Sequence, residues 1–128
     1  MLSLACVLAV LAGLVHVYIF VLESLRWQHP ATRRVFGTTE EQAAVTAPLA
    51  YNQGFYNLFL ALGAWAGVAW VLGGRDATGV ALVVLATGSM LAAALVLVTS
   101  DRAKTRAASV QGVFPALTLL ALLAWALG

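Results

Sequence analysis

The sequence predicts an all-α fold, a four-helix transmembrane bundle with both termini on the outer side of the membrane. Three observations lead to this prediction. The 128 residues are 62% hydrophobic and only 9% charged, which is more apolar surface than a soluble domain of this length can bury. Four apolar stretches reach the roughly 20 residues that a helix needs to cross a hydrocarbon core. The basic residues gather in two of the three connections between these stretches.

The four predicted helices cover about 2–22, 48–72, 78–99 and 108–127. We expect helices because the stretches lack the two-residue alternation of barrel strands, and because backbone groups in lipid must bond within their own segment. We expect one transmembrane domain over residues 1–128. A Gly-Gly pair between the second and third helices predicts a tight turn and an antiparallel hairpin.

The first connection is long and contains a signal for the start of a helix. Thr39 with Gln42, and Thr38 with Glu41, match the spacing of a capping box. These pairs predict a short helix over about 38–46, within an otherwise solvated cytoplasmic connector.

The distribution of basic residues sets the expected orientation. The first and third connections hold three each, the second holds one, and both tails hold none. The positive-inside rule therefore places the first and third connections in the cytoplasm, and we expect a multi-pass protein of the cell inner (cytoplasmic) membrane. The net charge of +2 follows from this topology, and no nucleic-acid partner is expected. The basic residues are Arg26, Arg33, Arg34, Arg75, Arg102, Lys104 and Arg106.

Polar side chains of all four helices fall in the predicted cytoplasmic half. In the first helix, His16 and Glu23 are seven residues apart, which leaves them within about 20° of one another on a regular α-helix. Polar groups that face lipid cost about 2–3 kcal/mol each, so we expect them to turn inward and enclose a polar pocket. The other polar residues at this end are Tyr51, Asn52, Gln53, Tyr56, Asn57, Thr99, Ser100, Asp101, Ser109 and Gln111.

Two roles follow for these residues. We expect His16 and Glu23 to be a candidate acid–base pair, because a low-dielectric pocket lets such groups exchange protons with a bound molecule. Each has a structural alternative: His16 as a core histidine bonded to a carbonyl group, and Glu23 as an interfacial carboxylate paired with an arginine. The candidate ligand contacts are Asn52, Gln53, Tyr56, Asn57 and Gln111, whose amides can also simply bond helix to helix.

The sequence contains no recognisable metal site. His16 and Glu23 lie two turns apart, whereas paired ligands on a helix lie three or four residues apart, and HExxH and CxxC patterns are lacking. Haem needs only one axial histidine, so His16 is also a candidate haem ligand; otherwise no cofactor is expected.

Gly63 and Gly67 form a small-xxx-small pattern in the second helix. Such a pattern permits close approach of two backbones. It fits either a seam within the chain or a homo-oligomer contact, and the spacing alone favours neither.

The stretches "HVYIFVLESLRW", "YNQGFYNLFLALG" and "VQGVFPALTLL" together resemble a family of small four-helix bacterial membrane proteins, domain of unknown function 1304. The resemblance covers nearly the whole chain. It implies a four-helix integral membrane fold and no established activity. The residues that carry it are His16, Glu23, Asn52, Gln53, Gly54, Tyr56, Asn57, Gln111, Gly112 and Pro115.

Three functions are compatible with these features. The first is binding of a small lipophilic molecule in the polar pocket, with membrane lipid as the surrounding partner. The second is a small intramembrane enzyme with isomerase-like or hydratase-like acid–base chemistry through His16 and Glu23, with or without haem. The third is a structural or assembly subunit of the membrane.

Overall fold

The computed structural model describes all 128 residues, and they form helices and turns without any strand. This confirms the all-α prediction. Four helices are long and apolar enough to cross a membrane. The elements in chain order are α1 (Leu2–Phe20), a π-helical turn η1 (Val21–Leu25), α2 (Pro30–Phe36), α3 (Glu40–Leu72), α4 (Asp76–Ser100), a 3₁₀ turn η2 (Arg102–Lys104) and α5 (Thr105–Leu127).

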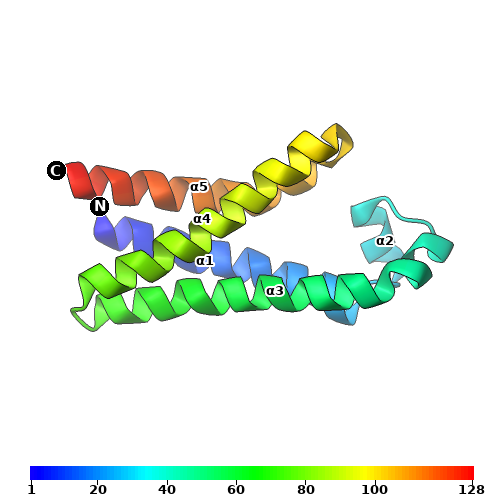
Figure 1. Ribbon diagram of the computed structural model, residues 1–128, viewed down its shortest axis with the longest axis horizontal. Helices are drawn as coiled ribbons and strands as arrows, with labels where there is room; N and C mark the ends of the chain where they lie inside the picture. Colours follow the sequence, from blue (N-terminus) through cyan, green and yellow to red (C-terminus); the bar gives the residue numbers. More distant parts are fainter.

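The long helices form a closed ring of neighbours. Helix α1 packs against α3 and α5, and α4 packs against the same two helices, so that α1 and α4 lie on a diagonal. Both chain termini and the α3–α4 turn lie at one end, and α2 lies at the other (Figure 1). We call these the terminal end (residues 1–13, 64–86 and 115–128) and the loop end (residues 16–57 and 94–112). The side of the membrane that each end faces stays a prediction.

The separate helix expected over residues 38–46 is wrong, because these residues are the first turns of α3. The capping box starts the helix where the sequence indicates: Thr39 Oγ1 accepts from Gln42 N at 3.1 Å, and Gln42 Oε1 accepts from Thr39 N at 3.0 Å. The helix then continues through Pro48 to Leu72. A proline inside a helix removes one backbone donor and crowds the carbonyl group four residues earlier, but the long hydrogen-bonded segments on both sides keep α3 continuous.

The short helix of the first connection lies upstream of the predicted one. Helix α2 begins with Pro30, a residue favoured at the first helical position, and is terminated after Phe36 by Gly37, which has a φ of 66°. The Lys104 ammonium donates to the carbonyl oxygen of Phe36 at 2.6 Å, and this bond ties the end of α2 to the connection between α4 and α5.

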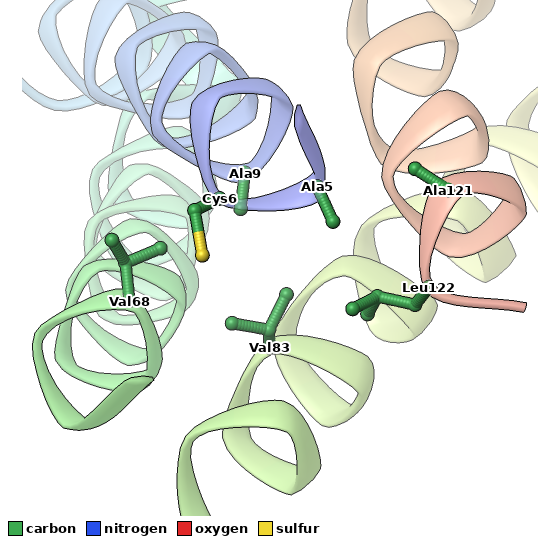
Figure 2. Close-up of a cluster of buried hydrophobic side chains, with 7 residues drawn as sticks. All are labelled: Ala5, Cys6, Ala9, Val68, Val83, Ala121 and Leu122. Carbon is green, nitrogen blue, oxygen red and sulfur yellow. The ribbon is translucent and has the colours of Figure 1, made fainter. Parts of the chain in front are cut away.

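Small residues let the helices approach closely at the terminal end. A Cβ atom at Gly67 would lie 2.8 Å from the carbonyl oxygen of Gly79, and one at Gly79 would lie 2.6 Å from that of Gly67. Gly67 therefore lies in a seam between α3 and α4 of the same chain. All four long helices contribute to the apolar cluster there (Figure 2), which consists of Ala5, Cys6, Ala9, Val68, Val83, Ala121 and Leu122.

Candidate functional site

The last turn of the first membrane-crossing helix is irregular. After Phe20 the chain continues as a π turn from Val21 to Leu25, a feature that is frequent at functional sites when it occurs as a single turn. The expected angle of about 20° between His16 and Glu23 assumed a regular α-helix. Because of the π turn, the α-helical repeat no longer applies between His16 and Glu23. The repeat alone therefore does not place the two side chains on the same face of the helix.

Helix α3 packs directly onto the π turn at Gly54. A Cβ atom there would meet Ser24 Oγ, and it would lie 2.9 Å from the Ser24 backbone nitrogen and 3.1 Å from Glu23 Cβ. Ser24 Oγ donates to the Tyr51 carbonyl oxygen at 2.7 Å. Glycine is therefore required at position 54 for the two backbones to approach and to present Glu23 to α3.

The contact places Glu23 beside Asn57. Asn57 Nδ2 donates to Glu23 Oε2 at 2.8 Å and to the Gln53 carbonyl oxygen at 3.2 Å. Asn57 is buried and Glu23 is half-buried. The one ion pair of the chain joins Arg33 to Glu40, so the expected alternative in which Glu23 pairs with an arginine is wrong. The carboxylate has an amide donor and no basic partner.

His16 lies inside the bundle and is 2% exposed. Its Nδ1 donates to the carbonyl oxygen of Ala12 at 2.9 Å, as in the alternative of a core histidine. No group of three or more His, Cys, Asp or Glu side chains is placed to hold a metal ion. With Nδ1 bonded to its own helix, Nε2 is the atom that a haem iron would require, and haem ligation by His16 stays a prediction.

The remaining candidate residues do not converge on Glu23. The side chains of Asn52, Gln53 and Tyr56 are exposed. Gln111 is half-buried and its side chain forms no hydrogen bond within the protein. Towards the loop end, the pair α4–α5 splays away from the pair α1–α3 (Figure 1). The structure therefore brings together Glu23 and Asn57, from two helices rather than four.

The hydroxyl groups at the loop end of α4 show why the polar side chains of the four helices need not meet in one pocket. Thr99 Oγ1 donates to the Leu95 carbonyl oxygen at 2.8 Å, and Ser100 Oγ donates to the Leu97 carbonyl oxygen at 3.0 Å. Because serine and threonine can bond to the preceding turn of their own helix, these groups are satisfied without contact to a second helix.

An open cleft of about 460 Å³ adjoins Glu23. It is lined by residues 23–29 together with Ala47 and Tyr51. The Trp27 indole forms part of its wall and is held by a hydrogen bond from Nε1 to Thr46 Oγ1 at 3.1 Å. Sequence reasoning missed the lining residues that follow Glu23, because it treated them as a solvated connector.

A row of aromatic rings extends from the cleft along α3. Tyr51 lies 5.1 Å from Phe55 and Phe55 lies 6.2 Å from Phe59, measured between ring centroids. Phe20 of α1 contacts Phe55 edge-on at 5.1 Å. The four-residue spacing of the α3 rings, which puts them on one helix face, was the signal in the sequence that could have found this row.

Comparison with known proteins gives one match. A family model described as a protein of unknown function (DUF1304) matches residues 10–123. The chain belongs to the DUF1304 family. The match confirms the resemblance drawn from the sequence, and it includes Glu23, Gly54 and Asn57 of this DUF1304 protein. No curated protein and no solved structure matches the chain. Family membership and the four candidate spans together indicate a multi-pass membrane protein.

Proposed function

We propose that the protein binds a small lipophilic molecule with a polar end at the loop-end cleft, and that Glu23 contacts the polar end. The carboxylate itself carries this proposal. It is half-buried near the end of a membrane-crossing helix, accepts one hydrogen bond from Asn57, and has no basic partner. Ionisable groups in such positions are costly and mark binding sites or pathways, so a carboxyl group without a basic partner here favours a ligand that supplies one.

The aromatic row supports an apolar body for this molecule. Tyr51 is 54% exposed and Phe59 is 58% exposed, and both belong to the row that begins at the cleft. A polar end at Glu23 would therefore continue into an apolar segment along the outer face of α1 and α3. Ligand sites commonly combine a few polar groups with apolar and aromatic walls in this way.

Basic residues and a tryptophan at the loop end favour one position of the cleft in the membrane. Six of the seven basic residues lie at the loop end, which favours the cytoplasmic side for this end. Trp27 in the cleft wall suits the headgroup level of the bilayer, where indole rings are enriched. We accordingly place the cleft at the cytoplasmic surface of the inner membrane.

Acid–base catalysis by His16 and Glu23 has less support than binding. His16 is bonded to its own helix and is not among the residues that line the cleft. Assembly through Gly63 and Gly67 also has less support, because the seam with α4 already occupies the Gly67 face.

Replacement of Glu23 tests the proposal. The variant Glu23→Gln keeps the size of the side chain and removes its charge, and Glu41→Gln is the matched control at an exposed carboxylate without a partner. Each protein is purified in a neutral maltoside detergent, and co-purifying small molecules and lipids are quantified by mass spectrometry. We expect the wild type and Glu41→Gln to retain the same molecule and folded Glu23→Gln to lose it. Equal retention by all three proteins contradicts the proposal.

A further inference from the structure

We infer that the molecule bound at the loop-end cleft is a phospholipid with a primary ammonium in its head group, of the ethanolamine type. This inference rests on the proposed function and narrows its ligand. The cleft would hold the ammonium at Glu23, the phosphate at Arg26, and the start of the acyl chains along the aromatic row.

The free oxygen of Glu23 favours a cationic hydrogen-bond donor. Asn57 donates to Oε2 at 2.8 Å, and no protein group donates to Oε1. Asn57 thus fixes the carboxylate and leaves its second oxygen for a ligand. A primary ammonium offers three N–H donors, and charge-assisted bonds of this kind are among the strongest that a site can form.

Aromatic rings beside the carboxylate favour the same group. Tyr51 and Trp27 both line the cleft, and the Trp27 indole N–H is already bonded to Thr46. What Trp27 offers to the cleft is therefore its ring. Ammonium groups are attracted to the faces of tryptophan and tyrosine rings.

A guanidinium in the same cleft favours a phosphate beside the ammonium. Arg26 lines the cleft, is exposed, and forms no ion pair or side-chain hydrogen bond with the protein. Guanidinium groups match the geometry of phosphate oxygens. The lining holds one carboxyl side chain, Glu23, and one guanidinium, Arg26, so the cleft complements a zwitterion better than a simple cation or anion.

The direction of the aromatic row favours a lipid over a water-soluble amine. Tyr51, Phe55 and Phe59 follow one another along α3 away from the cleft and towards the terminal end. Acyl chains attached to a head group in the cleft would take this direction into the bilayer. A soluble ethanolamine phosphate ester has no part that would use the row.

Native mass spectrometry of the protein in neutral maltoside detergent tests the inference. Two lipids with identical acyl chains are titrated: one carries an ethanolamine head group, and the other carries N-acetylethanolamine, which keeps the phosphate and lacks the ammonium. We expect the wild type to bind the ethanolamine lipid roughly tenfold more tightly, the factor for one charge-assisted bond. The variant Glu23→Gln should lose this preference, and Glu41→Gln should keep it.

A further variant separates the two charges. Arg26→Gln should weaken binding of both lipids by a similar factor, because both retain the phosphate. Equal affinities of the wild type for the two lipids overturn the inference without the need for any variant. If Glu23→Gln then still weakens binding of both lipids, the proposed binding function survives and only the ammonium is wrong. If the wild type binds neither lipid and Glu23→Gln changes no co-purifying molecule, the proposed function and the inference about the ammonium both fail.

Discussion

The two ends of the bundle use glycine for different purposes. At the terminal end, Gly67 faces the backbone of α4 at Gly79, and the contact closes an apolar core to which all four long helices contribute (Figure 2). At the loop end, Gly54 faces the π turn of α1, and the contact presents a carboxylate to an amide beside an open cleft. Close packing of small and apolar residues dominates the terminal end, whereas side-chain hydrogen bonds from Ser24 and Asn57 join α1 to α3 at the loop end. Changes at the two ends should therefore separate stability from ligand binding.

The largest effect is expected from Gly67→Ala at the terminal end. The added Cβ atom would lie 2.7 Å from Val83 Cγ2 and 2.8 Å from both the Gly79 carbonyl oxygen and the Val83 backbone nitrogen, so backbone must move. We expect a loss of about 3 kcal/mol in the free energy of unfolding, the upper part of the range for overpacking. Unfolding by sodium dodecyl sulfate in mixed micelles measures this loss. The matched control is Gly63→Ala, whose Cβ atom would make an ordinary contact of 3.6 Å with Ala86 and should leave stability unchanged. Similar losses of stability in both variants would show that close packing at position 67 does not stabilise the seam between α3 and α4.

A smaller loss of stability and a larger loss of binding are expected from Gly54→Ala. The added atom meets Ser24 Oγ, the end of a rotatable side chain, as well as the Ser24 backbone nitrogen at 2.9 Å. We expect a loss of about 2 kcal/mol on unfolding, together with loss of the co-purifying molecule because Glu23 is displaced. Gly67→Ala, when folded, should retain that molecule. If Gly54→Ala retains it equally well, the π turn does not position the site.

Asn57→Leu should have an intermediate effect. The substitution removes the donor to Glu23 Oε2 and leaves the carboxylate without a protein partner, so we expect a loss of about 1.5 kcal/mol, as for hydrogen bonds to charged groups. The control is Asn52→Leu, because Asn52 is exposed on the same helix. Both variants are compared by the same unfolding titration. A larger loss for Asn52→Leu would contradict the assignment of the contact.

Membrane helices were predictable from the sequence because their signal is composition over about 20 residues. Gly67 was also recognisable as a close-contact position, although only the structure assigns it to the seam with α4. The polar site was less predictable. Periodicity assumes a regular helix, and the π turn over Val21–Leu25 breaks this assumption at the residue that matters most.

The expected four-helix convergence failed for a different physical reason. It treated each polar residue near lipid as needing a partner on another helix, whereas Thr99 and Ser100 are satisfied by carbonyl groups of their own helix. Asn57 also bonds a carbonyl group of its own helix, at Gln53, but its amide donates to the Glu23 carboxylate of another helix as well. The cost of burying a polar group predicts that the group will form a hydrogen bond, but it does not predict which partner the group will bond.

The smallest effect is expected at the start of α3, where two reciprocal hydrogen bonds cap the helix. Thr39→Ala removes the side chain that caps Gln42 N and should cost about 1 kcal/mol, the usual value for a lost N-cap. Thr38→Ala is the matched control, because Thr38 Oγ1 is buried without a hydrogen-bond partner and its removal leaves no donor or acceptor unpaired. Hydrogen exchange of the first turn of α3 measures the difference locally. Faster exchange in Thr39→Ala alone is the expected result, and equal protection in both variants would mean that the capping box does not stabilise this end.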